Sequence, residues 1–327
     1  MRRHHPKRVG LLDEMINRRS TDVSLHTDSN VLVYLVHGVT GTPAEMYPLV
    51  RGMARRGWDV YSTTLPGHCT SLTDLLRTNE QDWLNHVQEQ LAFARSRYEH
   101  VFVVGLSVGA LIALQASTTV PVEGLGILSP TIIYDGWNVP WTHRILRPAI
   151  RMVPRPLQYL LFHMDGPPFG IKDPELQARM RAAYHPLGLL WRWVRGWAHS
   201  RKRREADRTV RGAEAASTGY PVFPLKTFAD MDRLITQVCD QLRAVSAPTV
   251  ILQAQEDDMT SPRNAYLIYD QIASTDKRVI LLEDCYHVIT VDKQSQAVVR
   301  HLTEFFHLRI ATKRQDKHTS PLRSVLS

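Results

Sequence analysis

The chain has 327 residues, of which 43% are hydrophobic and 22% charged, and its formal net charge is +8. This length and composition are typical of a globular protein with a sizeable core, and they exclude an intrinsically disordered chain. The three cysteines are too few for a disulfide or zinc framework. No apolar run has the length of a signal peptide or a membrane span, and no segment resembles a DNA- or RNA-binding motif. We therefore expect a cytoplasmic protein that binds no nucleic acid.

After a polar, irregular segment at 1–29, residues 30–130 alternate between strand and helix patterns. Continuous apolar, β-rich runs predict buried strands, and amphipathic spacing predicts the helices between them. The expected strands are 31–36, 58–62, 100–106 and 122–128, and the expected helices are 44–56, 78–98 and one that starts after Ser107. Such an alternation predicts an α/β fold whose mostly parallel sheet is covered by helices on both faces.

The alternation stops near residue 131 and resumes near residue 227. The second half then predicts strands at 247–254 and 278–283 and helices at 261–274 and 291–307. Residues 308–327 are polar and basic, so we expect a disordered tail there. The predicted core therefore combines 30–130 with 227–307.

The intervening residues 131–226 differ from the core in composition. They hold five of the seven tryptophans, many prolines and the basic run Arg201–Arg204. Prolines limit helices to short lengths, and an insertion at the carboxyl edge of a parallel sheet lies where ligand sites form. We expect this segment to form a helical cap over a site.

One short stretch predicts the chemistry of that site. Residues 105–109 read Gly-Leu-Ser-Val-Gly, between a predicted strand and a predicted helix. A G-x-S-x-G sequence in this context predicts a nucleophile elbow. The turn is so tight that Gly105 and Gly109 have to be small, and the Ser107 hydroxyl then stands clear of the sheet at a helix N-terminus.

A serine nucleophile needs a histidine base and a carboxylate that orients the base. In a fold with such an elbow the acid and then the base follow the last strands. The loop after 247–254 contains Glu256, Asp257 and Asp258, and the loop after 278–283 contains His287. His287 is therefore the predicted base, while chemistry alone leaves the acid open between Asp257 and Asp258.

The oxyanion of a tetrahedral intermediate needs two fixed N–H donors. The backbone N–H of Val108, at the head of the elbow helix, is one candidate. The second is the N–H of Val39 in the loop after strand 31–36, where His37 and Gly38 shape the backbone. His37 is also a second candidate base, but it precedes the serine, which is the wrong chain order.

Together these motifs resemble the α/β-hydrolase superfamily, and more narrowly bacterial carboxylesterases and monoacylglycerol lipases. The resemblance covers about 31–130 and 227–307 and rests on a short set of motifs: His37-Gly38, Leu65-Pro66-Gly67-His68, the elbow at Ser107, Asp257-x-Met259 and His287-Val288-Ile289-Thr290. It implies an α/β-hydrolase fold with a cap, and it selects Asp257 over Asp258 as the triad acid.

Three positions depart from the family pattern. Val39 stands where phenylalanine is frequent, which implies a wider acyl pocket. Cys69 and Cys285 stand where small residues are usual. Cys285 lies close enough to His287 in sequence to make the site sensitive to thiol reagents, or it is a small buried filler.

The expected activity is hydrolysis of carboxylic esters with medium or long acyl chains, through a Ser-Asp-His triad, an acyl-enzyme and no cofactor or metal. The alternatives are a thioesterase or acyltransferase that acts on carrier-bound acyl groups, and a non-catalytic binding protein of the same fold. The basic, tryptophan-rich stretch 189–204 is compatible with an acidic carrier protein or with peripheral contact at an anionic membrane surface.

Overall fold

The computed structural model describes residue 19 and residues 21–140, 149–150, 152–184 and 219–319. Within these ranges the core is a seven-stranded sheet in the order β1-β3-β2-β4-β5-β8-β9. Only β1 pairs antiparallel, with β3, and the other pairs are parallel. The strands are β1 (Val23–Leu25), β2 (Val31–Val36), β3 (Asp59–Thr63), β4 (His100–Leu106), β5 (Gly124–Leu128), β8 (Thr249–Ala254) and β9 (Lys277–Leu282).

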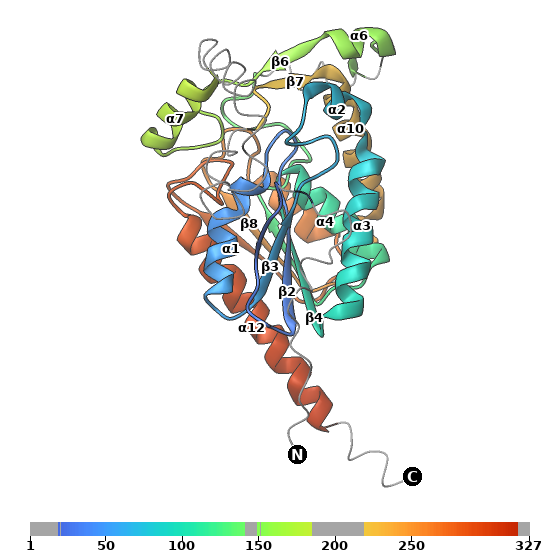
Figure 1. Ribbon diagram of the computed structural model, residues 1–327, viewed down its shortest axis with the longest axis vertical. Helices are drawn as coiled ribbons and strands as arrows, with labels where there is room; N and C mark the ends of the chain where they lie inside the picture. The colour runs from blue at the N-terminus through green and yellow to red at the C-terminus, as the bar shows by residue number, and fades with distance from the viewer. Residues whose placement is uncertain (1–18, 20, 141–148, 151, 185–218, 320–327) are drawn as a thin grey trace, which may run out of the picture.

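Helices cover both faces of this sheet, as the alternating sequence predicts. Helices α1 and α12 pack on one face, and α3, α4 and α10 pack on the other (Figure 1). The helices of the core are η1 (Pro43–Met46), α1 (Tyr47–Ala54), α2 (Leu72–Arg77), α3 (Glu80–Arg97), α4 (Val108–Thr119), α10 (Leu225–Gln241), η2 (Leu242–Ala244), α11 (Arg263–Gln271) and α12 (Ser295–Thr319). The predicted fold class, an α/β fold with a mostly parallel sheet, is confirmed.

The burial of both faces of strand β2 explains why its sequence is continuously apolar. Its even-numbered residues from Leu32 to Val36 join the hydrophobic cluster beneath α3, α4 and α10. Its odd-numbered residues from Val31 to Leu35 join the cluster beneath α1 and α12. Because both faces of the strand are covered, alternation with polar residues would place polar groups in one of the two cores.

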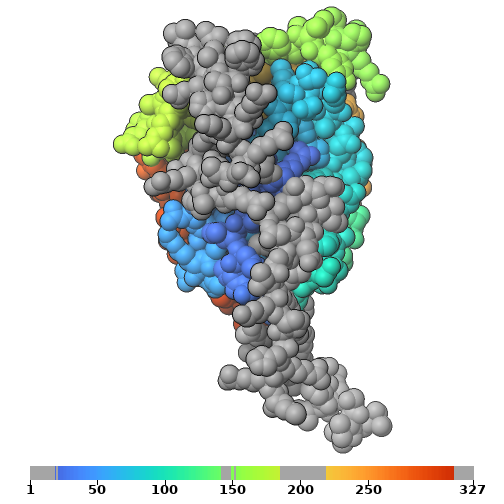
Figure 2. All heavy atoms as spheres, viewed as in Figure 1, coloured from blue at the N-terminus to red at the C-terminus, as the bar shows by residue number. Residues whose placement is uncertain are grey.

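The described part of the insertion consists of short elements. These are α6 (Arg155–Leu160), β6 (Phe162–Met164), α7 (Pro174–Tyr184) and β7 (Val222–Pro224), with β6 and β7 paired antiparallel. In the space-filling view α6, β6 and α7 gather at one end of the molecule, beyond helices α1 and α3 (Figure 2). The stretch 189–204, for which a carrier or membrane contact is expected, lies outside the described residues.

Two short elements were absent from the sequence-based prediction. Residues 23–25, inside the segment expected to be irregular, form strand β1 at the sheet edge, where Val23 pairs with Ser62 and Leu25 with Val60. Helix α2 follows the turn at Gly67 and is capped by Ser71, whose hydroxyl accepts the N–H of Asp74. Both are too short for a periodic pattern to predict them.

The expectation of disorder after residue 307 is wrong for residues 308–319, because α12 continues to Thr319. Ile310 remains buried. The Arg309 guanidinium lies 3.6 Å from the centroid of the Phe305 ring and pairs with the Asp276 carboxylate. The apolar face of α12 therefore extends beyond residue 307, where the helix predicted from the sequence ends. None of the described helices is long and apolar enough to cross a membrane.

Candidate active site

Ser107 lies at the sharp turn between β4 and α4, with φ 57° and ψ −119°. A β-carbon on Gly105 would lie 2.2 Å from the carbonyl oxygen of Gly109, and one on Gly109 would lie 2.4 Å from the carbonyl oxygen of His37. Any side chain at either position would therefore force the backbone apart. The two glycines let the chain turn tightly enough to hold Ser107 in the left-handed region, which is unfavourable for a residue with a side chain.

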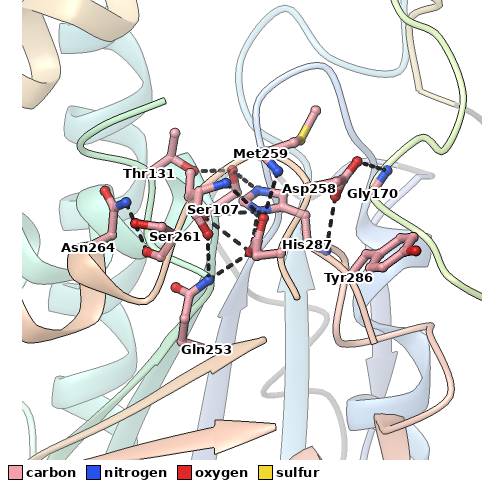
Figure 3. A network of polar contacts seen from close by, with 12 residues as sticks. Ser107, Thr131, Gly170, Gln253, Asp258, Met259, Ser261, Asn264, Tyr286 and His287 are labelled. Atoms are coloured by element: carbon pink, nitrogen blue, oxygen red, sulfur yellow. Dashed lines mark hydrogen bonds and ion pairs between the residues drawn. The ribbon is translucent and has the colours of Figure 1, made fainter. Parts of the chain in front are cut away.

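The structure brings Ser107, His287 and Asp257 together from three loops. His287 Nε2 lies 2.9 Å from Ser107 Oγ, and His287 Nδ1 lies 3.0 and 3.1 Å from the two carboxylate oxygens of Asp257. Asp257 follows β8 and His287 follows β9, so all three side chains meet at the carboxyl edge of the sheet. Figure 3 shows Ser107 and His287 side by side there. The predicted nucleophile, base and acid therefore form one continuous chain of hydrogen bonds.

The carboxylate of Asp257 is held by several donors besides His287. It accepts the N–H groups of Met259 and Thr260, both at 2.8 Å, and the side-chain amide of Gln253 at 2.7 Å. Asp257 is buried. Such donors fix the orientation of the carboxylate toward His287.

Two opposing effects act on His287, which is buried. Desolvation lowers its pKa, but the negative charge of Asp257 and the hydrogen bond to it raise the pKa, and Asp258 and Glu45 add to the increase. The net result is a pKa above the usual 6.5. The imidazolium that forms when His287 takes a proton is thus favoured at this position.

The neighbouring carboxylate, Asp258, has different contacts. It accepts the backbone N–H of Gly170 at 3.2 Å and that of His287 at 3.4 Å. Burial raises the pKa of Asp258. Its contacts are to the backbone of the cap and of the His287 loop, whereas the imidazole ring contacts Asp257.

Val39 and Val108 line the same cavity as Ser107. The N–H of Val108 lies at the first position of α4, where no intrahelical acceptor exists. Among the residues that the structure describes, no acceptor is recorded for the N–H of Val39. Both N–H groups are thus available to a ligand beside Ser107.

Two buried histidines support the loop that carries Val39. His37 Nδ1 donates to the Gly38 carbonyl at 2.7 Å, and its Nε2 accepts the N–H of Leu65 at 3.1 Å. His68 Nε2 accepts the N–H of Thr40 at 3.0 Å. Burial lowers the pKa of His37 to about 3 and that of His68 to about 4, so both rings are neutral. Since both nitrogens of His37 have backbone partners, His37 has no nitrogen free to act as a base.

A cavity of about 780 Å³ opens at Ser107 and His287. Polar side chains line it both beside Ser107 and in the cap, where His163, Asp165 and Arg179 take part. Aromatic and aliphatic side chains from the cap and α10 form much of the remaining wall: Phe169, Met180, Tyr184, Phe223, Phe228 and Met231. Val39 also lines it. This volume lies in the range of sites that enclose a small organic molecule.

Several residues of the site were not predicted from the sequence. Thr131 Oγ1 lies 3.0 Å from Ser107 Oγ, and Glu45 and Asp165 line the cavity. Desolvation raises the pKa of Glu45 to about 7 and that of Asp165 to about 6. For Thr131, the only signal in the sequence was its place shortly after the predicted strand 122–128.

Cys285 is fully buried, and its Sγ lies 3.9 Å from the Leu282 carbonyl oxygen. Burial raises the pKa of its thiol to about 12. A protonated, inaccessible thiol reacts slowly with thiol reagents. These features favour the interpretation of Cys285 as a small core residue.

The fold defines a class: this is an α/β-hydrolase-fold protein, with Ser107 at the sharp turn between β4 and α4. Residues 27–294 match the model of the serine aminopeptidase, S33 family. The chain belongs to this hydrolase family.

Two characterised bacterial proteins are similar along most of their length. A thermostable monoacylglycerol lipase of Bacillus sp. (strain H-257) is 27% identical over 84% of this chain and 89% of its own length. A carboxylesterase of Bacillus subtilis (strain 168) is 24% identical over 84% of this chain and 91% of its own. The resemblance inferred from the motifs, to carboxylesterases and monoacylglycerol lipases, is confirmed, and so is the prediction of a hydrolytic enzyme.

Solved structures show the same fold. One of the metagenome-derived lipolytic enzymes LipS and LipT superposes with a TM-score of 0.66 at 22% identity, covering 88% of this chain and 97% of its own. A monoglyceride lipase from Saccharomyces cerevisiae, bound to a substrate analog, superposes with a TM-score of 0.64 at 14% identity, covering 86% and 87%. The predicted α/β-hydrolase fold is confirmed.

Proposed function

We propose that this chain is a carboxylic ester hydrolase that acts through Ser107, His287 and Asp257. The observation that carries the proposal is the hydrogen-bonded chain from Ser107 Oγ to His287 Nε2 and from His287 Nδ1 to Asp257. The choice of an ester is supported by the two bacterial relatives, a monoacylglycerol lipase and a carboxylesterase. The substrate is a small acyl ester.

In the acylation step, Ser107 Oγ attacks the ester carbonyl carbon while His287 Nε2 takes the hydroxyl proton. The carbonyl electron pair moves to the oxygen, and the N–H groups of Val39 and Val108 donate to that oxyanion. When the tetrahedral intermediate collapses, the bond to the alcohol oxygen breaks and His287 gives the alcohol its proton. Asp257 keeps the imidazole oriented and stabilises its positive charge throughout.

In the deacylation step, His287 takes a proton from water, and the resulting hydroxide attacks the acyl-enzyme carbonyl. The same two N–H groups donate to the second oxyanion. The bond to Ser107 Oγ then breaks, Oγ regains a proton from His287, and the carboxylic acid leaves. Each proton that His287 accepts is thus returned within the same half-reaction.

The acyl group is of medium or long chain length in this proposal, and residues 131–226 form the cap that encloses it. The cavity of about 780 Å³ and its aromatic and aliphatic wall support this choice. Burying each methylene of an acyl chain against such a wall contributes about 0.8 kcal/mol. A longer chain therefore gains affinity until it fills the cavity.

Hydrolysis of p-nitrophenyl esters from acetate to palmitate tests the proposal, with the matched acyl thioesters and with glycerol as an added acceptor. We expect kcat/KM to rise from acetate to a medium or long chain, with esters cleaved faster than thioesters and little transfer to glycerol. An optimum at acetate would contradict the acyl assignment. Faster thioester cleavage would indicate a thioesterase, and dominant transfer to glycerol an acyltransferase.

A further inference from the structure

The Thr131 side chain contacts the oxygen that the proposed function assigns as nucleophile. Thr131 follows β5 at the start of the insertion and is buried, with 1% of its surface exposed. Its Oγ1 lies 3.0 Å from Ser107 Oγ (Figure 3). This contact is distinct from the one between Ser107 Oγ and His287 Nε2. Ser107 Oγ thus has two hydrogen-bond partners, and their directions decide what Thr131 does.

The direction of each hydrogen bond follows from Asp257. An ionised carboxylate only accepts, so His287 Nδ1 donates its proton to Asp257, and Nε2 of the neutral ring is an acceptor. Ser107 must then donate its only hydroxyl proton to His287 Nε2, at 2.9 Å. In its second contact the Ser107 oxygen has no further proton to donate, so it can only accept a hydrogen bond. Thr131 is therefore the donor in the bond to Ser107.

A buried amide holds the turn that carries Thr131. Asn264 Oδ1 accepts the N–H groups of Ile132 at 2.9 Å and Ile133 at 2.7 Å. Its Nδ2 lies 3.1 Å from both the Ile133 carbonyl oxygen and Asp135 Oδ1. Asn264 is completely buried in α11. These contacts fix the backbone directly after Thr131, so the hydroxyl has a defined position beside Ser107 before any substrate binds.

We propose that Thr131 is a catalytic hydrogen-bond donor to Ser107 Oγ. This inference rests on the proposed function. As His287 takes the Ser107 proton, negative charge builds on Oγ before its bond to the carbonyl carbon is complete, and the Thr131 hydroxyl stabilises that charge. The Thr131 proton stays on its own oxygen throughout. The same charge returns when Oγ leaves the acyl-enzyme, so both half-reactions depend on the hydroxyl.

The variant pair Thr131→Val and Thr131→Ser tests this inference, because valine keeps the shape and serine keeps the hydroxyl. The readouts are kcat and KM for a p-nitrophenyl ester and the second-order rate constant for phosphonylation by a fluorophosphonate. A hydrogen bond to a charged group contributes about 1.5–3 kcal/mol, so T131V should lower kcat and the phosphonylation rate about 10- to 100-fold. KM should stay within about twofold, and T131S should keep most of both rates.

Thr131→Ala is a second variant that removes the hydroxyl, for the case that T131V does not fold. Near wild-type rates in a folded T131V or T131A variant would overturn the inference. So would an equal loss in T131S, which would assign the role to the threonine methyl group. Failure of the proposed function has a different signature: Ser107→Ala would then retain ester hydrolysis whatever the result at Thr131.

Discussion

At the scale of single residues, Asp257 and Asp258 show how two adjacent carboxylates acquire different roles. Asp257 faces the imidazole of His287 and is held by the N–H groups that follow it in the loop. Asp258 points the other way, to the backbone of Gly170 and His287. Within one loop, adjacent carboxylates thus contact the imidazole ring in one case and the backbone of the cap and of the His287 loop in the other.

The first prediction concerns the pH dependence of activity. Because the Asp257 charge raises the pKa of His287, the acidic limb of kcat/KM in the wild type should have its midpoint above 6.5, with activity lost as pH falls through it. In Asp257→Asn the midpoint should move to lower pH, and kcat should fall about 10⁴-fold. Rate measurements across pH for the two proteins check both effects.

Asp258→Asn is the matched control for that experiment. It removes an adjacent carboxylate whose contacts are to backbone groups, so kcat should stay within about tenfold of the wild-type value. If D258N lost the larger share of kcat, the assignment of the acid would be reversed. A D257N midpoint at or above that of the wild type would contradict the electrostatic argument.

Much of the site follows from the sequence at this scale, and some of it does not. Ser107, His287 and the acidic loop are predictable because an elbow requires partners in a fixed chain order at the ends of known strands. Thr131 is not predictable in this way. Its hydroxyl reaches Ser107 only because β5 lies beside β4 and because Asn264, distant in sequence, shapes the following turn.

At the scale of elements, the cap segment that leads into α7 is tied to the loop of His287 through Asp292. This buried carboxylate accepts the N–H groups of Lys172 and Tyr286 at 2.8 Å, Lys293 at 2.9 Å and Asp173 at 3.0 Å. Two of these donors belong to the cap segment, and Tyr286 directly precedes His287, the proposed base. One side chain therefore sets the position of both the cavity wall and His287.

The second prediction concerns this tie. In Asp292→Asn an amide nitrogen replaces one carboxylate oxygen and leaves two backbone donors without an acceptor. Each unsatisfied buried donor costs about 1–3 kcal/mol, so the free energy of unfolding should fall by about 3 kcal/mol, and kcat should fall with it. Urea unfolding followed by tryptophan fluorescence checks the loss of stability.

Asp284→Asn provides the comparison, because Asp284 lies in the same loop but pairs with Lys172 and Lys293 while 54% exposed. Exposed ion pairs contribute less than about 1 kcal/mol. A D292N protein that unfolds at the wild-type urea concentration, or one that is no less stable than D284N, would contradict the proposed tie.

The elements themselves differ in how predictable they are. The central strands β2 and β4 are predictable since all their residues are buried and their sequences are almost entirely apolar. Strand β1 and the end of α12 are not, because each depends on a tertiary contact that no local pattern contains. For β1 the contact is pairing with β3, and for α12 it is the position of Arg309 between Phe305 and Asp276.

At the scale of the whole molecule, the parallel sheet brings the loops after β2, β4, β5, β8 and β9 to one edge, and the described part of the insertion closes over that edge. The loops and the insertion both supply polar groups to the cavity, such as His287 from the loop after β9 and Asp165 from the insertion, and the insertion and α10 supply much of its apolar wall. In the proposed function, the loop residues around Ser107 carry out the reaction, and the apolar wall from the insertion and α10 selects the acyl chain. A change of chain-length preference should therefore arise from cap residues such as Met180 or Phe223.

The central claim is that Ser107 is the nucleophile of an ester hydrolase. Reaction with a fluorophosphonate, followed by mass analysis of the peptides, tests it most directly, together with ester hydrolysis by Ser107→Ala. We predict a single phosphonylated site at Ser107 whose labelling abolishes activity, no labelling in S107A, and a loss of about 10⁶-fold in kcat in that variant. Labelling at another residue, or an S107A protein that hydrolyses esters at a rate near the wild-type value, would contradict the claim.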